Sequence, residues 1–243
     1  MSELSSPSAV VQLCFGPMKS GKSRFLVQKA EQLLQAGQSF LAFKPVQDTR
    51  DGSCIRTRDA AYRDVQALPV RNAKEMLTWI RQAVKTPHEL DLAKQANLFQ
   101  LPCMPLTTCF RAESPLTACL IDEVFLLDDA LFEVLDLLQS HGISVYMSGL
   151  DRDFRGEYFP LRATVGDQKA SMKDVIDRCD GLLPLTADCE FCGEPASLTQ
   201  RLINGEPAPY ESPTVLIGDE EYQPRCVDHH YVPHASLVSL DAV

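Results

Sequence analysis

Short apolar runs alternate with amphipathic segments along roughly the first three quarters of the chain. Apolar runs bounded by Gly, Pro or polar residues are typical of buried strands, whereas apolar positions that repeat every three or four residues indicate helices with one buried face. The pattern predicts strands at 10–15, 39–43, 116–121, 143–148 and 182–185. It predicts helices at 21–36, 72–95 (broken at Pro87), 128–140 and 169–179, and a loop or insertion around 86–115.

Strands that alternate with helices favour a parallel sheet with helices on both faces, so we expect an α/β fold. After residue 186 the composition changes, because Gly, Pro and Cys become frequent and the helical periodicity ends. We therefore divide the chain into a disordered tail (1–9), an α/β domain (10–186), a small lobe (187–232) and a second tail (233–243).

The 243 residues include 23 Lys and Arg against 33 Asp and Glu, which gives a formal net charge of −10. This charge disfavours general binding to nucleic acid, whose phosphates are held by many basic groups. We expect no membrane partner, because no apolar run approaches the roughly 18 residues of a spanning helix. Nine cysteines without a recognisable export signal favour a reducing, cytoplasmic setting, in which isolated cysteines such as Cys54 would be small buried apolar residues.

Residues 16–23 fit the phosphate-binding pattern G-x-x-x-x-G-K-[ST] completely. They follow a predicted strand and open a predicted helix, which is the context that this loop requires. Lys22 can reach the β- and γ-phosphates of a nucleoside triphosphate, Ser23 can bind Mg²⁺, and the backbone N–H groups can bind phosphate oxygens. The residues predicted to bind the phosphates here are Gly16, Pro17, Met18, Lys19, Ser20, Gly21, Lys22 and Ser23.

Two carboxylates, Asp122 and Glu123, follow the predicted strand 116–121. Open α/β sheets bind ligands beyond the carboxyl ends of their strands, so both side chains would face the phosphate-binding loop. Asp122 is suited to direct or water-mediated contact with Mg²⁺, and Glu123 to accepting a proton from an attacking hydroxyl. Alone, the pair could equally be an acidic helix N-terminus; together with the loop it indicates phosphoryl transfer.

The C-terminal lobe contains a C-x-x-C at Cys189 and Cys192 and a C-x-x-H at Cys226 and His229. Three cysteines and one histidine are a standard tetrahedral set for structural Zn²⁺. A redox C-x-x-C is the alternative, although that motif is expected near a thioredoxin-like βαβ unit. His230 could replace His229 as the fourth ligand.

Taken in order, the motifs closely resemble those of the type II, zinc-containing thymidine kinases. They read GPMKSGKS, KPVQDTR, LIDEV, GLDRDFRGEYF, LTADCEFCGEPASLTQRL and VLIGDEEYQPRCVDHH. The resemblance covers most of residues 10–230 and implies a P-loop NTPase-like sheet with a zinc lobe. It implies transfer of a phosphoryl group from ATP to the 5′-hydroxyl of thymidine or deoxyuridine, a loop called the lasso that closes over the nucleoside, and a homotetramer.

The resemblance also implies roles for single residues. Glu123 matches the catalytic base, Asp122 the acid beside the metal, and Arg50 an arginine near the phosphates. Phe125 stands where the family usually has Gln, and Tyr158 where it commonly has Pro. The residues that match the thymine pocket or the lasso are Met18, Leu126, Leu150, Phe154, Thr199, Thr214, Val215, Leu216, Ile217, Gly218 and Tyr222.

Two other functions stay open at this point. One is a P-loop kinase for another deoxynucleoside, because Phe125 and Leu126 replace the residues that the family usually has near the base. The other is a zinc-bearing P-loop ATPase that acts on nucleic acid, which the net charge and the absence of basic runs disfavour.

Overall fold

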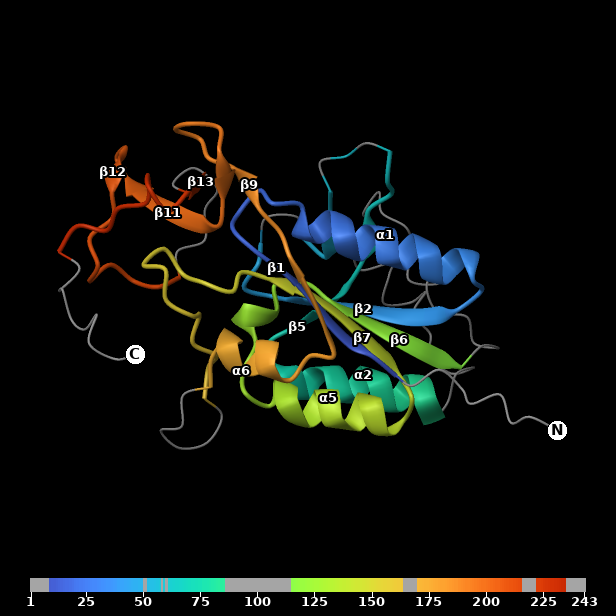
Figure 1. Cartoon of the computed structure of the whole chain (residues 1–243). Coiled ribbons are helices and arrows are strands. Elements are labelled where there is room, and N and C mark those ends of the chain that lie inside the picture. Colours follow the sequence, from blue (N-terminus) through green and yellow to red (C-terminus); the bar gives the residue numbers. More distant parts are fainter. Residues whose placement is uncertain are drawn as a thin grey trace.

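The computed structural model describes residues 9–49, 52–57, 59, 61–85, 115–163, 170–215 and 222–234. The predicted N-terminal tail, apart from residue 9, lies outside the described residues, and so do residues 235–243 and all but residue 115 of the predicted insertion. The described residues form a central sheet with helices on both faces and a C-terminal lobe of short strands (Figure 1).

Six parallel strands make up the central sheet, in the order β5-β2-β6-β7-β1-β8. Because all six run in the same direction, their carboxyl ends meet at one edge. In that order, their bounds are Leu68–Val70, Ser39–Pro45, Leu116–Ile121, Ser144–Gly149, Val11–Phe15 and Gly181–Pro184. The predicted α/β class with a parallel sheet is therefore confirmed.

Helices cover both faces of this sheet (Figure 1). One face carries α1 (Lys22–Gln35), which follows β1 directly. The other face carries α2 (Ala73–Lys85), α5 (Leu131–Ser140) and α6 (Met172–Asp177). A 3-10 turn, η1 (Val124–Leu126), follows β6.

The alternation of side chains along the strands creates two hydrophobic cores. In β2, Leu41 and Phe43 belong to the core beneath α2, α5 and α6, whereas Phe40 and Ala42 belong to the core beneath α1. All four side chains are fully buried. Successive residues of a strand point to opposite faces, so a strand covered on both sides is apolar throughout, as the sequence shows.

Within the described part of the α/β domain, three short strands were not expected from the sequence. They are β3 (Cys54–Ile55), β4 (Val65–Gln66) and β5, which extends the sheet beside β2. Strands of two or three residues are too short to show a period, so only their partners define them. The predicted helix at 169–179 is also shorter than expected, because α6 starts after Ser171, whose side chain forms a capping box with Asp174.

The strand pairs that the structure describes in the C-terminal lobe are all antiparallel. The lobe lies at the same end of the molecule as the start of α1 (Figure 1). One hairpin pairs β9 (Ala187–Asp188) with β10 (Pro195–Ala196). A second sheet has the order β12 (Glu206–Pro207), β11 (Leu198–Ile203) and β13 (Tyr222–Arg225).

Isolated cysteines behave in two ways. Cys14 and Cys119 are free thiols in the cores, and burial raises the pKa of Cys14 to about 12, although the nearby Lys22 charge lowers it. Cys54 is also buried but is disulfide-bonded, so the expectation for it is wrong. A disulfide needs two cysteines with their Cα atoms within about 7 Å, which the spacing along the chain does not reveal.

Among the described helices, none combines the length and the apolar character that a membrane span requires.

Candidate active site and metal centre

The phosphate-binding loop and the acidic pair lie at the same edge of the sheet. The loop follows β1, Asp122 and Glu123 follow β6, and β7 runs between these two strands. Because the three strands are parallel, their carboxyl ends place both groups on one side, as the sequence predicts.

Two glycines give the loop its shape. Gly16 has φ 147°, and a Cβ at this position would lie 2.2 Å from the carbonyl oxygen of Leu185, so no other residue fits. Gly21 has φ 92° and immediately precedes α1. The loop closes around Lys22, whose ammonium donates to the carbonyl oxygens of Gly16 (3.1 Å) and Pro17 (2.6 Å).

The loop also contains a buried polar atom that calls for a ligand. The Ser20 hydroxyl is buried and has no hydrogen-bond partner in the part of the chain that the structure describes. Buried polar atoms are normally paired, and a missing partner indicates a ligand or a water. A phosphate oxygen would satisfy it, and the start of α1 and the Lys22 charge favour an anion at the same place. The residues present therefore fit a triphosphate.

Asp122 is fixed from two neighbouring strands. The Ser148 hydroxyl at the end of β7 donates to Asp122 Oδ1 over 2.5 Å, and the backbone N–H of Asp122 donates to the Phe43 carbonyl of β2. Burial, followed by the adjacent Glu123 carboxylate, raises the pKa of Asp122 to about 7, while the Ser148 hydrogen bond and the Lys44 charge lower it. A cation bound at this carboxyl would favour its ionised form.

Glu123 has a backbone conformation that is rare for residues other than glycine. Its φ and ψ are 46° and 48°, and its side chain is buried with 8% of its surface exposed. The chain turns here into η1, which packs against Gly149, where an added Cβ would come within 3.1 Å of Val124. Left-handed backbone at a non-glycine residue concentrates at functional sites.

Further charged residues, to which we had assigned no role, lie at this edge. Lys44, near the end of β2, and Asp48, just after it, form a buried ion pair of 3.2 Å, and Lys44 also donates to the Cys54 carbonyl. Asp151 follows β7; burial raises its pKa, whereas the Arg152 and Lys22 charges lower it. Their positions at or just after the ends of predicted strands could have indicated from the sequence that they lie at this edge.

Two contacts join the phosphate-binding loop to the C-terminal lobe. The backbone N–H of Met18 donates to Thr199 Oγ1 on β11 (3.1 Å). Lys19 Nζ lies 2.5 Å from Oε1 of Glu190, a residue that stands between the two cysteines of the C-x-x-C in the sequence. The structure thus brings Met18 and Thr199 together, two residues that we expected in the nucleoside site, while Lys19 is paired with a carboxylate.

The other expected nucleoside residues have different surroundings. Phe154 is buried, with the Arg155 guanidinium 4.4 Å and the Arg201 guanidinium 5.6 Å from its ring centre. Leu126 and Leu150 are partly buried against the core beneath α2, α5 and α6. Thr214 and Tyr222 lie on either side of residues 216–221, whereas the positions outside the described residues are Arg50, Leu216, Ile217 and Gly218.

Two departures from the family pattern are accommodated by packing. Phe125 lies in the core, where its ring centre is 4.5 Å from that of Phe159. Tyr158 carries the Arg152 guanidinium 4.4 Å above its ring.

The four predicted metal ligands converge. The ligand atoms of Cys189, Cys192, Cys226 and His229 all lie within 4.8 Å of one another. Cys192 and Cys226 have their sulfur atoms 3.7 Å apart, close to the roughly 3.8 Å expected for two thiolates bound to one tetrahedral Zn²⁺ at about 2.3 Å. This cluster could hold a metal ion, which favours the metal over the redox interpretation.

The histidine alternative is decided by geometry. His229 Nδ1 lies 3.1 Å from the sulfur of Cys226, whereas His230 points elsewhere, with Nε2 2.8 Å from the Phe154 carbonyl oxygen. Burial lowers the pKa of His230. His229 is therefore the fourth member of the cluster.

Comparisons with known proteins agree with this arrangement. A thymidine kinase family model matches residues 9–88 and 105–231. The chain is 31% identical over 229 residues to a thymidine kinase of Mycoplasmoides gallisepticum, covering 93% of this chain and 83% of that protein. It is also 31% identical over 229 residues to a thymidine kinase of Thermococcus kodakarensis, covering 93% and 96% of the two chains. A family match over most of the chain, together with full-length similarity to these two kinases, shows that the chain belongs to the thymidine kinase family.

Proposed function

We propose that this protein transfers the γ-phosphoryl group of ATP to the 5′-hydroxyl of thymidine, or of deoxyuridine, as a step of nucleotide salvage that supplies dTMP for DNA synthesis. The observation that carries the proposal is the shared sheet edge, where the loop 16–23 and the pair Asp122 and Glu123 stand one strand apart. The family match supports the same reaction.

The triphosphate would lie in the loop 16–23. Lys22 would exchange its bonds to the carbonyls of Gly16 and Pro17 for phosphate oxygens, and the Ser20 hydroxyl would gain its missing partner. Ser23 and Asp122 would hold Mg²⁺, which neutralises the charge on the phosphates. The backbone N–H of Lys19, whose ammonium pairs with Glu190, and the Arg50 side chain would complete the phosphate site.

Glu123 would act as the base. It would take the proton of the 5′-hydroxyl while that oxygen forms a bond to the γ-phosphorus. The bond from the γ-phosphorus to the bridging oxygen breaks, and its electron pair leaves with ADP. Burial of Glu123 (8% exposed) keeps its carboxylate away from bulk water, which would otherwise compete as a nucleophile.

The nucleoside would bind between the sheet edge and the C-terminal lobe. Its flat base suits apolar walls, and its amide-like edges suit backbone N–H and C=O groups. We assign to this site Met18, Leu126, Leu150, Phe154, Thr199, Thr214, Val215, Leu216, Ile217, Gly218 and Tyr222.

The Cys₃His cluster would hold a structural Zn²⁺. Four protein ligands leave no open position, so the ion would stabilise the lobe rather than take part in the reaction. Through the contacts of Lys19 with Glu190 and of Met18 with Thr199, a stable lobe supports the phosphate-binding loop. A homotetramer in the cytoplasm, without nucleic acid or membrane partners, completes the proposal.

A coupled ATP-consumption assay tests the function. Purified protein would be assayed with Mg²⁺ and thymidine, deoxyuridine, deoxycytidine or deoxyguanosine, or with single-stranded DNA. We expect ATP consumption that depends on thymidine, with deoxyuridine also accepted. ATP hydrolysis that DNA stimulates and no nucleoside affects would overturn the proposal in favour of an ATPase, and a preference for deoxycytidine or deoxyguanosine would reassign the acceptor.

A further inference from the structure

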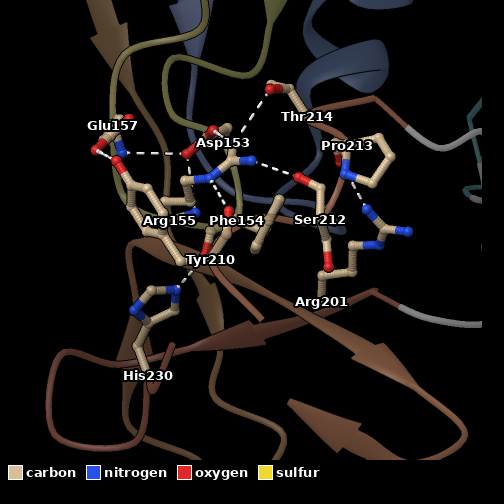
Figure 2. A network of polar contacts seen from close by, with 10 residues as sticks. All are labelled: Asp153, Phe154, Arg155, Glu157, Arg201, Tyr210, Ser212, Pro213, Thr214 and His230. Atoms are coloured by element: carbon tan, nitrogen blue, oxygen red, sulfur yellow. Dashed lines mark hydrogen bonds and ion pairs between the residues drawn. The ribbon is translucent and has the colours of Figure 1, made fainter. Parts of the chain in front are cut away.

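Arg155 lies at the centre of a network that joins two separate parts of the chain (Figure 2). It follows β7, and its side chain is 11% exposed. The guanidinium pairs with Asp153 Oδ2 at 2.6 Å. Its other bonds reach across the lobe interface, to the carbonyl oxygens of Tyr210 (2.6 Å) and Ser212 and to Thr214 Oγ1 (3.1 Å).

The segment that Arg155 binds, residues 210–214, has no strand or helix of its own. One backbone bond, from the N–H of Tyr210 to the Pro233 carbonyl (3.1 Å), ties it to the rest of the lobe, so side-chain contacts contribute much of what holds the segment in position. Two more contacts hold it in Figure 2: the Tyr210 hydroxyl donates to Glu157 Oε1 (2.6 Å), and Arg201 donates to the Pro213 carbonyl (2.7 Å). Arg155 by itself donates three hydrogen bonds to the segment, to Tyr210, Ser212 and Thr214, from one planar guanidinium. A lysine ammonium cannot reproduce this geometry.

The same guanidinium also lies against Phe154. Its central carbon is 4.4 Å from the ring centre, and Arg201 lies 5.6 Å from the same ring. The Phe154 carbonyl is in turn 2.8 Å from His230 Nε2. Arg155 therefore contacts both Phe154 and segment 210–214, which are far apart in the sequence.

We propose that Arg155 is a positioning residue for the nucleoside site. It holds segment 210–214 against the loop 153–157, so that Thr214 and Phe154 face the site in a fixed relationship before the nucleoside arrives. A site that is already ordered binds its ligand more tightly, because the binding free energy is not reduced by the entropy lost on ordering the segment. This inference rests on the proposed function.

The contacts of Arg155 predict which kinetic constant responds. Its described partners belong to the loop 153–157 and to segment 210–214, and none belongs to the phosphate-binding loop. Loss of these bonds would therefore weaken nucleoside binding more than ATP binding. Charge-assisted hydrogen bonds are strong enough for a rise of about tenfold or more in the KM for thymidine.

The test compares Arg155→Gln with a control, Arg178→Gln. Arg178 also donates hydrogen bonds, to Asp136 and Gln139, but on the face covered by α5 and α6. We expect Arg155→Gln to raise the thymidine KM about tenfold or more, with the ATP KM and kcat within about threefold of wild type. Hydrogen exchange of peptides covering 208–215 should be faster in the nucleoside-free variant, and the control should match wild type in both measurements.

Arg155→Lys keeps the charge beside Asp153 and serves if the glutamine variant does not fold. It should also raise the thymidine KM, because an ammonium cannot bind Tyr210, Ser212 and Thr214 together. If a folded variant has an unchanged thymidine KM, or unchanged hydrogen exchange at 208–215, Arg155 does not have this role. The proposed function would still stand in that case, provided that the wild-type protein phosphorylates thymidine. Wild-type protein that does not phosphorylate thymidine would overturn the proposed function and this role with it.

Discussion

The Ser148 hydroxyl donates to Asp122 Oδ1 over 2.5 Å, which joins the carboxyl ends of the neighbouring strands β7 and β6. Both side chains are buried, so water does not compete with this bond. The bond stabilises the ionised carboxyl against its burial and against Glu123. We therefore expect this hydrogen bond to favour the ionised form of Asp122, the form that can bind a cation, at neutral pH.

Ser148→Ala should shift the pH dependence of activity. Without the hydroxyl, the pKa of Asp122 rises above its value of about 7, because hydrogen bonding to the ionised form lowers it. The acid limb of the kcat/KM profile should move to higher pH by up to about one unit. The measurement is activity from pH 6 to 9 at several Mg²⁺ concentrations. Ser140→Ala, at an exposed hydroxyl on α5, is the control, and an unmoved profile would contradict the role of Ser148.

Asp122→Asn should stabilise the fold while it removes activity. The folded pKa is about 7 against an ordinary value of 3.8, so between these values the folded state holds the extra proton. The stability contributed by this group is therefore present at low pH and decreases as the pH rises through about 7. At pH 8 the variant should be more stable than wild type by about 1–2 kcal/mol, with a smaller difference at pH 4.

The measurement is denaturant unfolding at both pH values. Asp177→Asn, at an exposed carboxyl on α6, should show no such difference. A variant less stable than wild type at pH 8 would mean that Asp122 is ionised and favourably paired in the folded protein.

Glu123→Gln should lower kcat about 100-fold or more, because a general base is removed. ATP binding should be nearly unchanged, since glutamine is isosteric and the phosphate-binding loop is untouched. Single-turnover rates and ATP titrations measure the two effects separately. Glu133→Gln, at an exposed position of α5, is the matched control. If turnover stays near that of wild type, Glu123 is not the base.

Cys189→Ser should remove the bound metal and destabilise the C-terminal lobe, because structural zinc contributes folding energy directly. Purified wild type should contain about one zinc per chain by elemental analysis. The contacts Lys19–Glu190 and Met18–Thr199 predict that the KM for ATP also rises. Cys179→Ala, at a thiol outside the cluster, should keep both its zinc and its ATP affinity. Wild type without zinc would contradict the metal assignment.

The features predicted correctly from the sequence are those in which neighbours along the chain define the geometry. The strand before residue 16 and the helix after it place the phosphate-binding loop, and the strand 116–121 places Asp122 at the same sheet edge. The two short cysteine and histidine motifs were also recognisable, because each ligand pair is formed within four residues.

Contacts between distant residues were not predictable in this way. Phe125 differs from the family residue, yet only packing against Phe159 shows that its ring lies in the core. The choice of His229 over His230 depends on which ring faces Cys226, and the two are adjacent in sequence. The disulfide of Cys54 was likewise not predictable from the spacing of cysteines along the chain.

By itself, then, the sequence determined the fold class, the position of loop 16–23 between a strand and a helix, the acidic pair after the strand 116–121 and the two short cysteine and histidine motifs, because short-range spacing and periodicity encode each of them. Only the tertiary structure decided that Ser148 supports Asp122 and that Arg155 holds segment 210–214 beside Phe154. Such contacts join residues from separate strands and loops, and their distances depend on how the whole sheet and the lobe pack together.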